Sequence, residues 1–271
     1  MPNPPLFVGV AASASLAGLL FSAPPVLADS GELAKQLANP IASLVSVPFQ
    51  ANFDSNIGPD DDGDRLTVNV QPVIPMSLNE DWNLISRTIL PIVDQSDIFP
   101  GAGSQSGLGD TVQSFFFSPK QPTDGGWIVG GGPVLLLPTG TDDLLTADKW
   151  GAGPTGVALK QTGPWTVGGL VNHIWSFAGD DDREDVSQSF VQPFFTYTTP
   201  EAVSYTLTAD STYNWKSNDW TIPIGAFAAK VFSVGRQTMQ VQAGPRYYAA
   251  SPDSGPEGWG ARFSFVLLFP K

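Results

Sequence analysis

The chain has 271 residues, of which 26 are acidic and 13 are basic, so its formal net charge at pH 7 is -13. This charge argues against nucleic-acid binding, which rests on neutralising phosphates with Lys and Arg, and the absence of cysteine excludes disulfides, thiolate catalysis and cysteine metal sites. No apolar run reaches the roughly 20 residues of a membrane-spanning helix, while 17 Phe and 8 Trp argue against disorder.

The first 28 residues have the pattern of a signal peptide. Residues 6–21 are apolar and small, and Val26 and Ala28 suit a small-residue cleavage site, although the start carries no Lys or Arg. The alternative is a buried helix of the mature protein. An exported chain without cysteine suits a bacterial envelope.

Residues 29–40 form a separate N-terminal segment. Leu33, Ala34 and Leu37 lie at helical spacing, which predicts a short helix over 31–39. Residues 41–271 then form the main domain, in which apolar and polar residues alternate in segment after segment. Period two over many residues indicates strands with one apolar face. The clear alternations are at 45–53, 66–71, 203–215, 238–247 and 259–269, and weaker ones are at 82–93, 107–117, 127–137, 150–160, 165–177, 186–198 and 220–233.

The connections between these twelve expected strands alternate between long and short, as the two ends of a membrane barrel do, and only the short connection 216–219 breaks this alternation. All eight tryptophans fall at expected strand ends, which is typical of interfacial aromatic girdles. Most acidic residues gather in the long connections. A sheet in hydrocarbon must close on itself to pair its backbone groups. We therefore expect an all-β fold, an antiparallel up-and-down transmembrane barrel of about twelve strands; the alternative is a soluble β-sandwich, whose strands are usually shorter.

The polar half of each alternation is expected to line the lumen, because a charge on the lipid face costs about 2–4 kcal/mol at the midplane. This parity turns Arg246, Arg262 and Asp210 inward, and Arg87 is grouped with them although its strand alternates poorly. Two roles stay open for these charged residues, solute contact and ion pairs that brace the barrel. The full set of candidate lumen residues is Arg87, Arg246, Arg262, Asp210, Asn69, Gln71, Gln240 and Gln242, with Thr206 and Thr208 completing the lining.

Several segments resemble a known family, among them 40–50, 78–87, 107–110, 149–154, 172–176 and 262–271. Together they are similar to the outer-membrane transporter family named for the meta-pathway of phenol degradation, whose members are sometimes mislabelled neuromedin. The resemblance covers nearly all of the mature chain and implies an outer-membrane barrel that passes small, often hydrophobic or aromatic, solutes. It brings no established set of binding residues.

Catalytic and metal chemistry find little support in the sequence. The single histidine, His173, would need a nucleophile within reach, and Ser176 points to the opposite face of a strand. We interpret His173 as a girdle residue and expect no enzyme activity, no cofactor and no metal site. The acidic runs 60–64 and 180–185 lack a complete calcium motif, so they are either solvated or hold divalent cations at the lipopolysaccharide surface.

The sequence thus predicts a channel or transporter for small solutes in the outer membrane of a Gram-negative bacterium. The expected partners are outer-membrane lipid, lipopolysaccharide and a small-molecule solute, with no nucleic acid and the oligomeric state left open. The alternative hypothesis is a structural or adhesive surface barrel with a closed lumen and partner-binding acidic loops. An envelope hydrolase centred on His173 is a third hypothesis. The segment 29–40 either plugs the lumen or lies in the periplasm.

Overall fold

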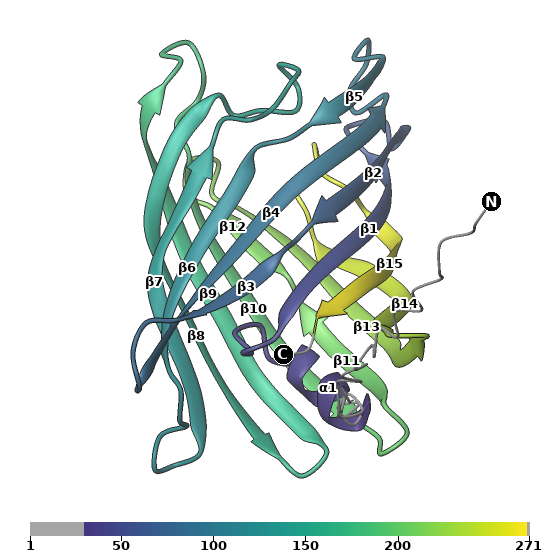
Figure 1. Ribbon diagram of the computed structural model, residues 1–271. Helices are drawn as coiled ribbons and strands as arrows, with labels where there is room; N and C mark the ends of the chain where they lie inside the picture. The colour runs from purple at the N-terminus through teal and green to yellow at the C-terminus, as the bar shows by residue number, and fades with distance from the viewer. Residues whose placement is uncertain (1–29, 270–271) are drawn as a thin grey trace, which may run out of the picture.

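The computed structural model describes residues 30–269, which form a closed antiparallel β-barrel with one short helix (Figure 1). The expected fold class is confirmed, and the proposed signal peptide lies outside the described residues. The elements are α1 (Ser30–Leu37), β1 (Val45–Ile57), β2 (Gly63–Val70), β3 (Val73–Ser77), β4 (Trp82–Ser96), β5 (Ser104–Leu108), β6 (Thr111–Pro119), β7 (Trp127–Leu137), β8 (Lys149–Thr162), β9 (Trp165–Gly179), β10 (Ser187–Thr198), β11 (Val203–Ala209), β12 (Ser211–Asn214), β13 (Asp219–Val234), β14 (Gln237–Ala250) and β15 (Gly258–Phe269).

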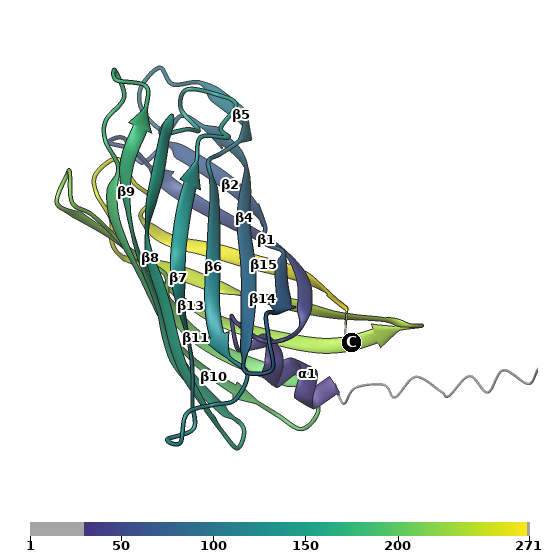
Figure 2. The ribbon, with the colours of Figure 1, turned by 60° about the vertical axis from the view of Figure 1, so that its left-hand side comes forward.

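Pairing between the first and last strands closes the barrel. β1 runs antiparallel to β15 in a continuous register from Val45 opposite Phe269 to Phe53 opposite Ala261. Once the interrupted strands described below are joined, every other pairing is between neighbours in sequence, so the topology is up-and-down. Closure leaves no strand edge exposed, which is the condition for a sheet to cross a bilayer. The strands run obliquely around the wall (Figure 2).

Twelve barrel strands account for the fifteen strand segments, because three barrel strands are each interrupted once. β2 and β3 are separated at Pro72, which has no N–H to donate. β11 and β12 are separated at Asp210, whose N–H donates to the Pro223 carbonyl at 3.1 Å while Pro223 returns no bond. β5 and β6 both pair with β4, but their registers along β4 differ by one residue. The break between them is at Gly109 and Asp110, beside Pro91.

The two faces of the wall differ as the alternation predicts. Along β15, Arg262, Ser264, Val266 and Leu268 are buried, whereas Phe263 and Phe269 are exposed. All eight tryptophans are exposed, with exposed fractions from 41% at Trp165 to 66% at Trp259. Large apolar side chains on the outside, flanked by tryptophans at the strand ends, are typical of a surface that contacts lipid.

The two ends of the barrel also differ. One end carries the links 78–81, 120–126, 163–164, 199–202 and 235–236, and the other carries 58–62, 97–103, 138–148, 180–186, 215–218 and 251–257. We call these the short-turn end and the long-loop end. The first long loop is shorter than expected, since β1 continues past residue 53 to Ile57 and carries Asp54 on its buried face. This loop turns at Gly58, whose φ of +86° is open to glycine at no steric cost.

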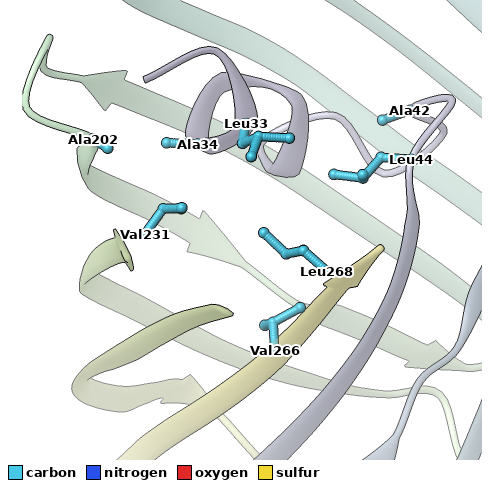
Figure 3. Packing of buried hydrophobic residues seen from close by; sticks show 8 residues of the cluster. All are labelled: Leu33, Ala34, Ala42, Leu44, Ala202, Val231, Val266 and Leu268. Atoms are coloured by element: carbon cyan, nitrogen blue, oxygen red, sulfur yellow. The ribbon is translucent and has the colours of Figure 1, made fainter. Parts of the chain in front are cut away.

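Helix α1 lies at the short-turn end and packs against the inner wall (Figure 3). Leu33 and Ala34 are buried against Val231 of β13 and Leu268 of β15. The rest of this cluster consists of Ala42, Leu44, Ala202 and Val266. The Gln161 side-chain amide also donates to the Lys35 carbonyl at 2.9 Å. Residues 30–44 therefore lie against the inner wall at the short-turn end. Within residues 30–269, no helix is both long enough and apolar enough to span a bilayer.

Candidate functional site

The inner wall carries a row of polar side chains towards the long-loop end. Arg246 on β14 donates to Asp54 on β1, with Nη1 at 2.9 Å from Oδ1, and both side chains are buried. Arg246 also donates to the Tyr248 hydroxyl at 3.2 Å. The row continues along neighbouring strands, since Arg65 Nε donates to Gln95 Oε1 at 2.8 Å and Gln95 Nε2 to Gln105 Oε1 at 3.1 Å. These bonds tie β14 to β1, and β2 to β4 and β5, from the inside.

A second group lies deeper in the lumen around Arg262 on β15. Its Nε donates to Asn52 Oδ1 at 2.7 Å and its Nη2 to Asp210 Oδ2 at 2.7 Å, over the intervening strands β14 and β13. The guanidinium carbon lies 4.8 Å from the centre of the Phe227 ring, within cation–π range. Asp210 also accepts a bond from Gln192 at 2.7 Å. This ion pair therefore spans the inner face of β13 and β14 and takes up space in the lumen.

Between this group and the N-terminal segment lies an internal cavity of about 230 Å³. Five of the eight predicted lumen residues line it: Gln71, Arg87, Gln240, Gln242 and Arg262. Arg87 Nη2 donates to Gln71 Oε1 at 3.2 Å. Thr206 and Thr208 also line it, whereas Arg246 and Asp210 lie in the neighbouring ion pairs. The structure therefore brings seven of the predicted side chains to one compartment and leaves Arg246 and Asp210 beside it.

Asn69 stands apart from the other candidates. It is half-buried and lies opposite Gln50 on β1 and Pro91 on β4, outside the lining of the cavity. Its neighbour Gln50 does line the cavity. The parity of β2 places Asn69 on the same face as Arg65, so it contributes to the inner wall above the cavity rather than to the cavity itself.

Sequence reasoning missed several lumen residues that the structure reveals. Asp54 was placed in a loop, although it continues the alternation of Gln50 and Asn52 by one more step. Ser264 stood in the polar half of a clear alternation and could have been included by the same rule. Phe194 and Phe227 face inward among polar residues, and no sequence pattern distinguishes them from lipid-facing phenylalanines.

His173 lies on the outer face, in a contact that the sequence did not indicate. Its Nδ1 is 2.7 Å from Ser189 Oγ, and Trp215 Nε1 donates to the same hydroxyl at 2.9 Å. The imidazole lies 4.0 Å from the Trp175 ring, centre to centre. Its Nε2 is buried and has no hydrogen-bond partner within the described part of the chain, so no acidic side chain there orients the ring as the acid of a Ser–His–Asp triad does. The partner of His173 is therefore Ser189 rather than Ser176.

The acidic loops carry ion pairs of their own. Asp185 in the link 180–186 lies 3.3 Å from Lys149 Nζ and 3.6 Å from Lys216 Nζ. The hydrogen bond with Lys149, a second from Ser176, and the charges of Lys149 and Lys216 lower the pKa of Asp185. In the part of the chain that the structure describes, no three His, Asp or Glu side chains gather as metal ligands would.

Comparison with known proteins supports the fold. No family model matches the chain, and no curated protein matches it, so the resemblance to the phenol meta-pathway family is not confirmed by name. Among solved structures, an outer membrane channel from Pseudomonas putida F1 is similar at a TM-score of 0.67 and 16% identity, covering 84% of this chain and 96% of that chain. At this identity the likeness shows a shared outer-membrane barrel fold.

Two further structures are similar more distantly. The β-domain of a Bordetella autotransporter has a TM-score of 0.47 at 14% identity, covering 82% of this chain and 98% of its own. The outer membrane phospholipase of Salmonella typhi has a TM-score of 0.48 at 11% identity, covering 90% and 98%.

The phospholipase corrects one expectation. Excluding enzyme activity from a barrel of this type was wrong, since the barrels that this chain resembles include an enzyme. The distant likeness assigns no activity to this chain, and the fold alone does not separate enzymes from channels.

Proposed function

We propose that this chain is an outer-membrane channel that passes small solutes through a narrow lumen. In this proposal the long-loop end faces the cell exterior and the short-turn end faces the periplasm, as in bacterial barrels generally. The observation that carries the proposal is the internal cavity, which is lined by charged and amide side chains and is enclosed by a wall whose outer face is apolar. A polar lumen inside a lipid-facing barrel is the arrangement of a solute pathway.

The constrictions suggest that the solutes are small. The pairs Arg246–Asp54 and Arg262–Asp210 occupy the lumen above the cavity, and residues 30–44 occupy the mouth below it. A twelve-stranded barrel is also intermediate between filled eight-stranded barrels and open porins of 16 or more strands. Passage therefore requires solutes that fit between these side chains, or movement of the N-terminal segment.

A specific observation also favours the alternative, a structural or adhesive barrel with a closed lumen. The cluster around Leu33 and Ala34 anchors the N-terminal segment to β13 and β15, and a permanently seated segment would block flow. Current through the protein separates the two functions, because a closed barrel carries none.

The experiment that tests the proposal is single-channel recording in a planar bilayer with the full chain refolded in detergent. Folding is verified beforehand by heat-modifiable mobility on a gel. Steady, ohmic current steps in potassium chloride support the channel. Silence from a folded barrel would contradict an open or flickering channel and favour the closed structural role.

A further inference from the structure

The internal cavity has the features of a binding site for one particular class of solute. Its walls combine two guanidinium groups, several side-chain amides and a patch of apolar side chains. We propose that it binds a small organic monoanion, a carboxylate carried on a compact apolar ring. This inference rests on the proposed channel function and names the solute class that the lumen selects.

The first argument is charge. Two basic residues, Arg87 and Arg262, line the cavity, and no acidic residue does. Arg262 is neutralised by Asp210 at 2.7 Å. Arg87 takes part in none of the four ion pairs among the described residues, and its hydrogen bond goes to the neutral amide of Gln71. The compartment thus holds one positive charge without a contacting carboxylate, which a monoanion would balance.

The geometry of Arg87 suits a carboxylate in particular. A guanidinium has five N–H donors in a planar fork that matches the two oxygens of a carboxylate. Among the described residues only Nη2 of Arg87 has a hydrogen-bond partner, Gln71 Oε1 at 3.2 Å, which leaves Nε and Nη1 to bind a ligand. Charge-assisted bonds of this kind are roughly twice as strong as bonds between neutral groups.

A second, independent observation comes from Ser264. This residue is 4% exposed, it lines the cavity, and its hydroxyl has no hydrogen-bond partner in residues 30–269. A buried polar group without a partner costs about 1–3 kcal/mol, so such groups are rare unless something else satisfies them. A rotation of the Ser264 side chain about χ1 to another staggered position would turn its hydroxyl to a ligand oxygen in the cavity, which would accept the proton and remove this cost.

The apolar part of the lining determines which group can carry the carboxylate. Phe194, Phe227, Leu37 and Val266 contribute to the same cavity as the polar groups. Aromatic rings favour offset or edge-on contact with another ring. The cavity volume of about 230 Å³ is below the roughly 300–1,000 Å³ of pockets for drug-sized ligands. The apolar part of the ligand is therefore limited to about one ring.

The binding test uses the full chain folded in detergent, with benzoate as the probe and isothermal titration calorimetry as the readout. Benzyl alcohol has the ring without the charge, and acetate has the charge without the ring. We expect both to bind at least about tenfold more weakly than benzoate, since a difference of 1.4 kcal/mol corresponds to that factor. No binding of benzoate, or equal binding of benzoate and benzyl alcohol, would overturn the proposal.

Variants assign the binding to the cavity. Arg87→Gln should weaken benzoate at least about tenfold and leave benzyl alcohol unchanged. Ser264→Ala, which removes a single hydroxyl, should weaken benzoate several-fold and provides the test if Arg87→Gln does not fold. The matched control is Arg236→Gln in the exposed link 235–236, which should bind as the parent does. Unchanged benzoate affinity in folded Arg87→Gln, or in Ser264→Ala when it is the variant tested, contradicts the site.

Bilayer recording keeps this inference separate from the channel function. If benzoate reduces the chloride current of the parent but not that of Arg87→Gln, the result supports both the channel function and the carboxylate site. Chloride current that benzoate leaves unchanged supports the channel and overturns its carboxylate site. Benzoate binding by calorimetry without any current supports the site and overturns the channel.

Discussion

Arg246 and Asp54 form their ion pair directly across Gly260. The register places Gly260 of β15 opposite Arg246 of β14 on one side, and the β1–β15 register places it next to Asp54 on the other. A methyl group on Gly260 would lie 2.8 Å from Asp54 Oδ1 and 2.7 Å from the Phe53 carbonyl oxygen. The missing side chain therefore leaves the space through which Arg246 reaches Asp54.

The first prediction concerns this glycine. Gly260→Ala should displace the Asp54 side chain and lower the free energy of unfolding by about 1–3 kcal/mol, the usual cost of overpacking. Urea-induced unfolding in lipid vesicles measures it. The matched control is Gly156→Ala, where the nearest atom to an added methyl group is the Gly130 carbonyl oxygen at an ordinary 3.8 Å. Equal stability of the two variants would mean that Gly260 is dispensable.

The second prediction concerns the charge of Asp54 rather than the space at Gly260. Asp54→Asn leaves the buried Arg246 guanidinium without its carboxylate, and breaking a buried pair in this way costs about 3–5 kcal/mol. The double variant Asp54→Asn with Arg246→Gln should regain part of this loss, because both charges are then gone. The same urea titration compares all three proteins. A double variant less stable than Asp54→Asn alone would show that Arg246 contributes more through packing than through the pair.

The third prediction concerns ion selectivity. Within the lumen groups described above, Arg65, Arg87, Arg246 and Arg262 outnumber Asp54 and Asp210, so an open pore should prefer anions. Arg262→Ala and Arg246→Ala should each shift the reversal potential in a potassium chloride gradient towards that of a cation-preferring pore. Folded variants with the parent's reversal potential would make these arginines braces of the barrel rather than parts of the pathway.

The fourth prediction tests the N-terminal segment as a plug. Leu33→Glu places a charge among Val231, Val266 and Leu268, where it has no partner, so α1 should leave the mouth and conductance should rise. Single-channel recording measures the change. Glu32→Gln, on the exposed face of the same helix, is the control and should conduct as the parent does. Conductance unchanged in Leu33→Glu would show that α1 does not limit the current.

The fifth prediction is a pH dependence at the long-loop end. The pKa of Asp185 is lowered by its hydrogen bond with Lys149, by a bond from Ser176 and by the charges of Lys149 and Lys216. A lowered carboxyl pKa stabilises the folded loop above the ordinary pKa of about 4, and this contribution is lost as the pH falls through the lowered value. Hydrogen exchange in residues 180–186, corrected for its intrinsic rate, should therefore increase on acidification below about pH 4.

The control for this dependence is a variant without the titrating group. Asp185→Asn should exchange rapidly in residues 180–186 already at pH 7 and show little further change with acid. Asp253→Asn in the link 251–257 should behave as the parent, since Asp253 is in no ion pair among the described residues. Protection in Asp185→Asn equal to that of the parent at pH 7 would contradict the role of the ion pairs.

The barrel itself was predictable, because lipid on one side and a polar lumen on the other enforce a strict two-residue period. Arg246, Arg262 and Gln242 followed from this period alone. It fixes only which face a side chain is on, so it did not indicate that Arg262 reaches Asp210 three barrel strands away, or that Ser189 meets His173. Those contacts depend on register between strands. Asp54 was misplaced for a different reason, since the acidic run after it is typical of a loop.

The cluster that holds α1 joins the two ends of the chain. Leu33, Ala34 and Leu44 come from its beginning, and Val266 and Leu268 come from its last strand. The helix therefore has no complete docking surface until β15 has been synthesised and has paired with β1. A barrel in which β15 has not paired with β1 therefore leaves Leu33 and Leu44 without the contacts that bury them. Seating of the helix and closure of the barrel are thus coupled, because both depend on the same strand.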